Sequence, residues 1–291
     1  MPRDADELVE LLDLETIDDN LFRGAQMPTS RPIVFGGQAA AQALVAASRT
    51  VPDGFAVHSL HSYFLQPGDP SAPTIYDVDN LRDGRSFLTR RVIAQQHGRP
   101  IYAQTASYHK EEPGLEHEEP MPEVPDPEDC RPVSRRTRDE LHADQWSVAD
   151  IRVIGSSAVG GLEDDPSRPG RQRVWLRVSS PLPDDPFWHA AAFTYLSDMT
   201  LAGATLSAHG LSFGSGEVFL ASLDHAVWFH RPFRADEWWL YDQHSPATAN
   251  GRGLVLARVF QPGRGLVASV AQEAVLRPRK AASPGSQGGV R

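Results

Sequence analysis

The stretch 39–47 constrains the fold of this chain more than any other. Gln42 is its only polar residue, and most of the others are alanine, which has the highest helix propensity. The spacing predicts a helix that is apolar on nearly all sides, so other elements must surround it. The pattern of the next residues indicates an antiparallel meander wrapped around that helix. Its candidate strands are residues 57–65, 74–79, 86–95 and 101–108.

The second half of the chain repeats this order of elements. Pro67 ends one strand as Pro232 ends its counterpart, 232 − 67 = 165 residues later, and Gly84 matches Gly251, 251 − 84 = 167 residues later. Two similar offsets at matching turns indicate an internal duplication of a unit made of one helix and one sheet. The second unit contains a candidate helix at 189–202 and candidate strands at 173–179, 218–230, 238–243, 253–260 and 266–276.

A short amphipathic helix is predicted at residues 7–14, ahead of the first unit. Residues 111–129 hold nine acids and five prolines, a composition typical of a linker rather than of a core element. We expect a first unit at 8–110, a linker at 111–150 with partial helix from 139, a second unit at 151–280 and a disordered tail at 281–291.

Charge and cysteine content exclude several classes of protein. The chain has 291 residues with a formal net charge of −10, which argues against a nucleic-acid partner. Cys130 is the only cysteine, so no intrachain disulfide can form, and histidine spacing indicates no metal site. No apolar run is long enough to cross a membrane and no secretory signal is recognisable, so we expect a cytoplasmic protein without a cofactor.

The candidate strand 218–230 is unusually polar for a core strand. It carries Ser222, Asp224, His225 and His230, so either one of its faces is solvated or it forms part of a site. Histidines on strands usually form structural hydrogen bonds. His58 and His61 occupy the corresponding strand of the first unit, which favours a repeated packing role; of the four, His58 is the first to test as a catalytic base.

Several motifs in fixed order resemble those of the type II acyl-CoA thioesterases. The resemblance runs from about residue 8 to residue 277 and weakens only in the acidic linker. It implies an α+β double-hotdog fold, in which two helix-wrapped antiparallel sheets join, and hydrolysis of medium- or long-chain fatty acyl-CoA. The motifs are residues 21–24 (LFRG), 34–38 (VFGGQ), 58–68 (HSLHSYFLQPG), 81–84 (LRDG) and 224–233 (DHAVWFHRPF).

The resemblance also implies that Asp198, Ser222 and Gln272 form the catalytic site. Asp198 has apolar neighbours on its helix face, where an aspartate is desolvated and needs a partner or a task. Gln272 alternates with apolar residues and therefore faces inward. Strand alternation alone places Ser222 on the outer face, so its role depends on the resemblance. Because helix 39–47 lacks an aspartate, we expect one active centre per chain.

The sequence gives weaker signals for substrate-binding residues than for the catalytic ones. Gly36 and Gly37 precede the helix. They could form a plain tight turn, or this end of the helix, with its free N–H groups, could receive a ligand oxygen. His58 is a further candidate. Arginines could bind the coenzyme A phosphates. Arg82 and Arg85 are favoured over Arg90 and Arg91 for this role.

The expected reaction is attack of a water, oriented by the three catalytic residues, on the thioester carbonyl without a covalent acyl-enzyme. Two alternatives remain open: a hotdog enoyl-CoA hydratase or dehydratase, and a non-catalytic acyl-CoA sensor. We expect a homo-oligomer, either a dimer or a tetramer.

Overall fold

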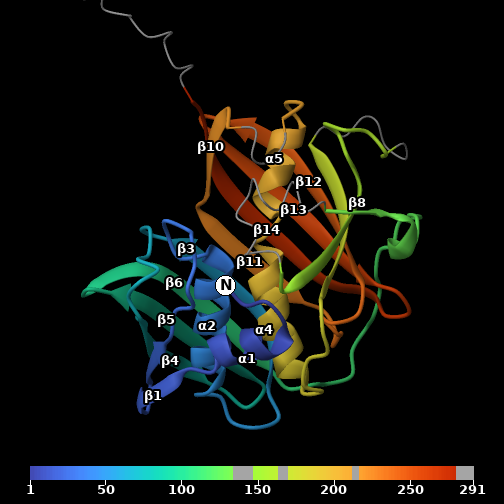
Figure 1. The fold of residues 1–291 in the computed structure, drawn as a ribbon. Helices are drawn as coiled ribbons and strands as arrows, with labels where there is room; N and C mark the ends of the chain where they lie inside the picture. Colours follow the sequence, from blue (N-terminus) through green and yellow to red (C-terminus); the bar gives the residue numbers. More distant parts are fainter. Residues whose placement is uncertain (134–146, 163–169, 212–215, 280–291) are drawn as a thin grey trace, which may run out of the picture.

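The computed structural model describes residues 1–133, 147–162, 170–211 and 216–279 (Figure 1). Its helices are α1 (Ala5–Leu12), α2 (Gly36–Ser48), α4 (Pro186–Ser197) and α5 (Ala204–Ser207), with the short 3-10 helices η1 (Pro127–Asp129) and η3 (Leu201–Gly203). The strands of the first half are β1 (Glu15–Asp18), β2 (Leu21–Gly24), β3 (Ala56–Phe64), β4 (Thr74–Asp83), β5 (Phe87–Gln96) and β6 (Arg99–His109). Those that follow are β7 (Arg131–Pro132), β8 (Ala149–Ser156), β9 (Arg171–Val178), β10 (Val218–Ser222), β11 (Asp224–Phe229), β12 (Trp239–Ala249), β13 (Arg252–Gln261) and β14 (Gly265–Pro278).

One antiparallel sheet runs through both halves of the molecule. Its strand order in the described residues is β1-β2-β4-β5-β6-β3-β11-β14-β13-β12-β9-β8-β7, and β10 pairs with β14. The halves join where β3 pairs with β11, with Leu60 opposite Val227. Because backbone hydrogen bonds cross this junction, the two units share one continuous sheet.

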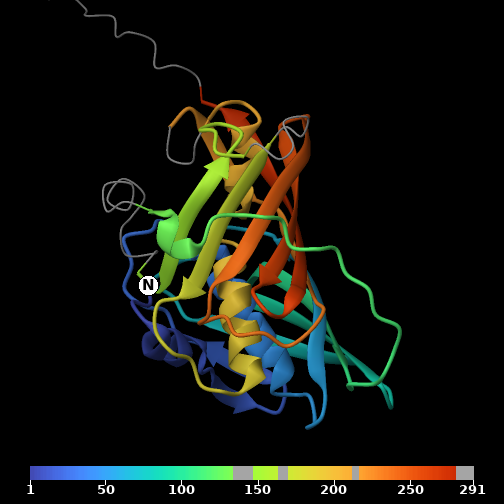
Figure 2. The same ribbon diagram turned by 90° about the vertical axis from the view of Figure 1, so that its right-hand side faces the viewer.

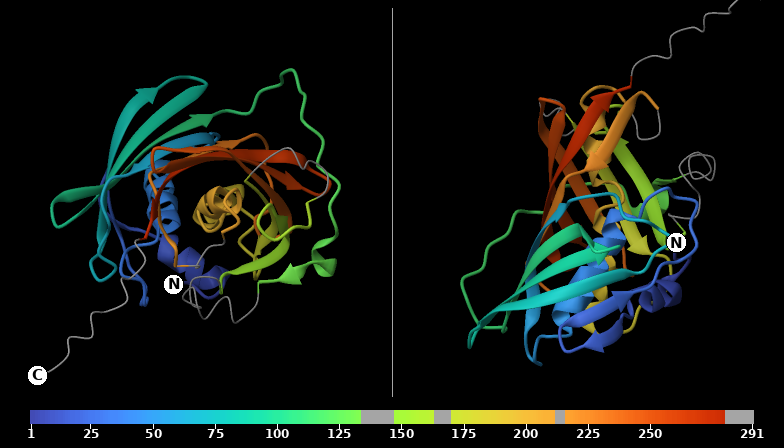
Figure 3. Two further views of the ribbon diagram at one scale, coloured as in Figure 1. Left: turned by 90° about the horizontal axis from the view of Figure 1, so that it is seen from above. Right: turned by 90° about the vertical axis from the view of Figure 1, so that its left-hand side faces the viewer.

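Each half of the sheet curves around one helix. Seen from above, α4 lies inside the curved second half, while α2 lies against the first (Figure 3). Nearly every residue of α2 from Gly37 to Ala47 is buried, including Gln42, whose amide nitrogen donates to the backbone oxygen of Leu11 at 2.8 Å. The double-hotdog fold and the duplication are therefore confirmed, and the helix expected at 39–47 is surrounded as its composition demands.

Two predicted elements differ from the structure. The helix expected at 189–202 ends at Ser197, with Asp198 as its C-terminal cap, and the chain continues as η3 and α5. The strand expected at 218–230 is broken at Leu223 into β10 and β11. Both differences bear directly on the site described below.

The acidic segment 111–133 is extended and lies against the second half of the sheet, where its path is visible at the outside of the molecule (Figure 2). The indole nitrogen of Trp175 donates to the carbonyl of Pro125 at 2.9 Å. Met121 and Val124 pack on a cluster that includes Trp175 and Phe260. This linker therefore covers an apolar strip on the outer face of the sheet. Of the partial helix expected at 139–150, residues 139–146 lie outside the described residues, and the expectation is wrong for 147–150, where a turn leads into β8. The tail expected at 281–291 also lies outside the described residues.

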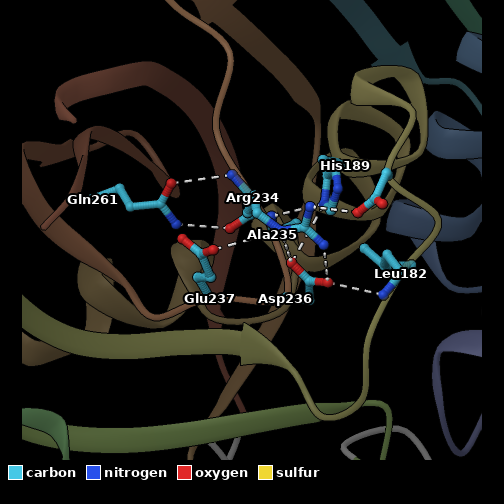
Figure 4. A network of polar contacts seen from close by, with 8 residues as sticks. Leu182, His189, Arg234, Ala235, Asp236, Glu237 and Gln261 are labelled. Carbon is cyan, nitrogen blue, oxygen red and sulfur yellow. Dashed lines mark hydrogen bonds and ion pairs between the residues drawn. The ribbon is translucent and has the colours of Figure 1, made fainter. Parts of the chain in front are cut away.

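A polar network fixes the start of α4 (Figure 4). The side chain of Asp236 accepts from the backbone N–H of Leu182 at 2.9 Å and from Arg234 at 3.0 Å. Nδ1 of His189, in the first turns of α4, accepts from the backbone N–H of Ala235 at 3.2 Å. Gln261 bonds the backbone of Arg234 through both of its side-chain atoms. The helix that carries Asp198 at its far end is thus anchored to the loop after β11.

Within the described residues, no helix has both the length and the apolar character needed to span a membrane.

Candidate active site

The end of α4 delivers Asp198. This helix is buried on nearly all sides, from His189 to Ser197, so its C-terminus lies inside the protein rather than at the surface. Asp198 is the C-terminal cap, and its carboxyl group is directed toward the sheet, where it meets β10 and β14. A carboxylate in such a place needs hydrogen-bond donors.

A bulge in the sheet turns Ser222 inward. Ser222 pairs with Ala274 of β14, whereas Ala226 pairs with Ala271, so the register of the two segments differs by one residue. The extra residue is Leu223. Because the bulge resets the alternation, Ser222 of β10 and His225 of β11 both face the interior. The expectation from alternation that Ser222 faces outward was wrong, because it assumed an unbroken strand.

Gln272 lies on the inner face of β14 and is 1% exposed. Its Nε2 donates to Oγ of Ser222 at 2.6 Å and to Oδ1 of Asp198 at 3.0 Å. Oγ of Ser222 donates to the same carboxylate oxygen at 3.2 Å. The three residues, which lie 24 to 74 positions apart in the sequence, therefore form a closed triangle of hydrogen bonds. This triangle is called the triad below.

The triad leaves one carboxylate oxygen, Oδ2 of Asp198, for another partner. Both hydrogens of the Gln272 amide are directed at triad atoms, and the Ser222 hydroxyl hydrogen is directed at Oδ1. Burial raises the pKa of Asp198, whereas His225, the donors Gln272 and Ser222, and Arg31 lower it; burial is the larger effect. A carboxylate of raised pKa, with one oxygen that accepts no hydrogen bond from the part of the chain that the structure describes, is suited to accept a proton.

The N-terminus of α2 faces that free oxygen. A Cβ placed on Gly36 would lie 2.6 Å from Oδ2 of Asp198 and 2.7 Å from the ring of Phe64. A Cβ on Gly37 would lie 2.2 Å from the backbone oxygen of Tyr195. Glycine is thus required at both positions for the close approach of α2 to α4. The first N–H groups of a helix have no acceptor within the helix, so this end can bind an oxyanion.

Arg31 is a cation that interacts electrostatically with Asp198. Its guanidinium carbon lies 5.2 Å from the ring centroid of Phe35, and its buried Nε has no hydrogen-bond partner among the described residues. Burial lowers the pKa of Arg31, and the negative charge of Asp198 opposes that effect.

We expect the substitution Arg31→Gln to move the acidic limb of the pH dependence of kcat/KM to higher pH. Arg31 stabilises the ionised form of Asp198, so its removal raises the pKa of that carboxyl further. The measurement is thiol release between about pH 4 and 8. Arg23→Gln, which alters an exposed arginine paired with Glu15, is the matched control. An acidic limb that stays in place in Arg31→Gln would contradict this electrostatic role.

The structure brings together only part of the set expected from the sequence. Asp198, Ser222 and Gln272 meet, and Gly36 adjoins them. His58 does not join them: its Nε2 is 2.8 Å from Oγ of Ser107, and its ring contacts Phe87 and His109. Arg82 and Arg85 are exposed near the turn between β4 and β5, whereas Arg90 is 2% exposed and bonded to Asp83 and Thr50.

Three contributors to the site were not assigned to it from the sequence, which favoured a packing role for His225 and gave none to Ser197 or Arg31. His225 contacts Gln272, Ser197 contacts His225, and Arg31 lies within electrostatic reach of Asp198. The alternation of His225 with Val227 and Phe229 does place it on the inner face, so the sequence held that signal. Nothing in the spacing around Ser197 or Arg31 indicates their contacts.

Comparisons with known proteins show which sequences and structures this chain is similar to. A family model described as acyl-CoA thioesterase matches residues 163–275, and one described as acyl-CoA thioesterase N-terminal domain matches residues 24–109. Mouse acyl-coenzyme A thioesterase 8 is 37% identical over 93% of this chain and 88% of its own. Acyl-CoA thioesterase 2 of Haemophilus influenzae is 34% identical over 93% of this chain and 96% of its own.

Solved structures give the same relationship. The acyl-CoA thioesterase II of Mycobacterium marinum is 42% identical, with a TM-score of 0.81 over 93% of this chain and 98% of that one. A TesB protein of Mycobacterium avium subspecies paratuberculosis is 31% identical, with a TM-score of 0.79 over 94% of this chain and 100% of that one.

Proposed function

Because this chain belongs to the acyl-CoA thioesterase family and hydrolyses acyl-CoA, we propose that a single water bound at Oδ2 of Asp198 is the nucleophile. The observation that carries this proposal is the triangle of hydrogen bonds that engages Oδ1 and leaves Oδ2 without a donor among the described residues. Ser222 and Gln272 hold the carboxylate in one orientation, so its second oxygen keeps a fixed direction toward the substrate.

In this mechanism the oxygen of the water bonds to the thioester carbon while Asp198 accepts a proton from that water. The carbon–sulfur bond then breaks, the electron pair leaves with sulfur, and the proton passes from Asp198 to the coenzyme A thiolate. The products are a free fatty acid and coenzyme A. A thiolate is a good leaving group, so the reaction does not need a stronger nucleophile such as an activated serine.

The oxyanion of the intermediate is assigned to the N–H groups of Gly36 and Gly37 at the start of α2. Their approach to Asp198 supports this role, since the thioester carbonyl must lie within reach of both the water and its oxyanion donors. The positive end of the helix dipole favours the same placement.

We assign the acyl chain to the apolar inner face of β10 and β14, which adjoins the triad. The inner residues that follow Ser222 and Gln272 are Leu220, Val218, Ala274 and Leu276, and they pack with Ala202 and Leu206. At the far end of this face lies a pocket of about 360 Å³ lined by Leu206, Leu211, Val218 and Leu276, among others. From Gln272 to Leu276 the strand rises about 13 Å, a length suited to medium or long chains.

Filling this cavity should change chain-length preference without abolishing hydrolysis. We expect Val218→Trp to lower kcat/KM for the longest acyl-CoA accepted by at least about tenfold, since each buried methylene contributes about 0.8 kcal/mol. Rates for short chains should stay within about twofold. Phe219→Trp, at the adjacent and 46% exposed position, is the control. Equal losses for short and long chains would contradict the assignment of the cavity to the acyl chain.

The test of the proposed function is thiol release from a chain-length series of acyl-CoAs, with product analysis. Free acid and coenzyme A in equal amounts support it. An enoyl product would indicate a hydratase or dehydratase, and binding without thiol release would indicate a sensor. Either outcome would overturn the proposal.

Three finer features remain part of the proposal. Arg82 and Arg85 are candidates for the coenzyme A phosphates, and their exposure supports access to a charged ligand. His58 is a candidate for substrate contact. We place the protein in the cytoplasm as a dimer or tetramer, and the exposed side chains of Tyr63 and Trp228 on the outer face of the central strands support the assembly. Sedimentation of the purified protein measures the assembly directly.

A further inference from the structure

A histidine lies behind the triad, on the side of Gln272 away from Asp198. Nδ1 of His225 is 2.6 Å from Oε1 of Gln272. His225 is 0% exposed and belongs to β11, whose register with β14 places it next to Gln272. The sequence indicated a structural hydrogen-bonding role for the strand histidines, and this contact gives one of them a specific partner.

The contact decides which way the Gln272 amide points. An ionised carboxylate only accepts hydrogen bonds, so the amide must direct its NH2 group at Asp198 and its oxygen at His225. That oxygen needs a donor, and Nδ1 of His225 must therefore carry a hydrogen. Rotating the amide by half a turn would place Oε1 against Oδ1 of Asp198 and an N–H group against the Nδ1 hydrogen. Both contacts would be repulsive.

The imidazole itself is held from the other side. Nε2 of His225 is 2.8 Å from Oγ of Ser197, which is the residue before Asp198 and is fully buried. The hydroxyl of Tyr241 donates to the backbone oxygen of Ser197 at 3.0 Å. Oγ of Ser62 donates to the backbone oxygen of His225 at 2.7 Å. Two residues, Gln272 of β14 and Ser197 of α4, thus hold the ring, and the backbone bonds from Tyr241 and Ser62 hold the segments that carry Ser197 and His225.

We propose that His225, held by Ser197, is a positioning residue that keeps the NH2 group of Gln272 directed at Asp198 and Ser222. The inference rests on the proposed function, because it gives Gln272 its task. Burial lowers the pKa of His225, which favours the neutral ring. A neutral ring with hydrogen on Nδ1 accepts at Nε2 from the Ser197 hydroxyl, whose oxygen lies 2.8 Å from Nε2 and 3.2 Å from the backbone oxygen of Thr194. Both ring nitrogens of His225 are engaged by Gln272 and Ser197, which supports action through Gln272.

The test compares His225→Leu with His225→Asn. Leucine removes the donor, whereas the asparagine amide restores an N–H group close to the place of Nδ1. We expect kcat of His225→Leu to fall by about tenfold or more with KM within about twofold, because orientation matters in the transition state more than in binding. His225→Asn should retain most of the wild-type kcat. His230→Leu, which removes an exposed histidine bonded to Ser269, is the control.

A double-mutant cycle separates positioning from an independent role. If His225 acts through Gln272, then His225→Leu should cause no further loss of kcat in a Gln272→Leu background. A full further loss there, or His225→Asn as inactive as His225→Leu at an unchanged melting temperature, would overturn the inference. So would wild-type kcat in His225→Leu.

The result also distinguishes this inference from the function it builds on. If the wild-type chain releases no thiol, the proposed function itself fails. If wild type and Gln272→Leu behave as proposed but His225→Leu is fully active, only the positioning role fails. Should His225→Leu not fold, Ser197→Ala provides the second variant: it removes the hydroxyl at Nε2, and we expect a loss of kcat of about threefold or more that is absent in the Gln272→Leu background.

Discussion

Replacing Asp198 with asparagine should lower kcat by a factor on the order of 10² or more, because the amide cannot accept the proton of the attacking water. Asparagine keeps the size of the side chain and an oxygen that can accept from Gln272 and Ser222. KM should change little, since the group acts in the transition state. The measurement is thiol release at saturating acyl-CoA, with Asp224→Asn, a half-buried aspartate of the neighbouring strand, as the control.

The same variant should be at least as stable as the wild type near neutral pH. The folded-state pKa of Asp198 is raised by burial, so the folded protein holds that proton more tightly than the unfolded chain. The stability that this protonation contributes is present at low pH and is lost as pH rises through the folded pKa. Asparagine removes the cost of a buried charge. An inactive variant with a lower melting temperature at pH 7 would indicate a damaged fold rather than a lost base.

The second large effect is expected at Gln272. Gln272→Ala should also lower kcat by a factor on the order of 10². The Gln272 amide donates to both of the other triad residues, so its loss removes one donor from the carboxylate and leaves Oγ of Ser222 without its 2.6 Å donor. The measurement is again thiol release at saturation.

A matched control for this variant lies one position further along β14. Glu273→Ala changes a residue that faces outward and pairs with Arg252, so we expect it to keep near wild-type kcat. Rates within about threefold of wild type for Gln272→Ala would eliminate the triad as described.

Much of the scaffold could be predicted from local patterns. The helix at 39–47 has nearly uniform apolar character, and the strands around it end at turns that contain Pro, Gly and Asp, so both signals lie within a few neighbouring residues. The edge strands β1, β2, β7 and β8 were not predicted, because they are short or partly exposed and their apolar pattern is weak. The two halves could be matched because the same turns recur at similar offsets.

Only part of the candidate site could be predicted from the sequence. The resemblance indicated Asp198, Ser222 and Gln272. Of the two strand residues among them, strand alternation by itself placed only Gln272 on the inner face. Alternation failed for Ser222 because the bulge at Leu223 depends on how β10 and β11 pair with β14, which is a property of the whole sheet. The contact of His225 with Gln272 likewise depends on strand register. Distances between residues so far apart in the sequence are set by tertiary packing and not by local propensity.

The most direct test of the central claim is a single turnover of wild-type protein with acyl-CoA, quenched at intervals and followed by intact-mass measurement. If water held at Asp198 is the nucleophile, thiol and free acid should appear at the same rate and the protein mass should stay unchanged. A burst of thiol ahead of free acid, with the acyl mass added to the protein at Ser222, would contradict the account, because it would make that hydroxyl the nucleophile.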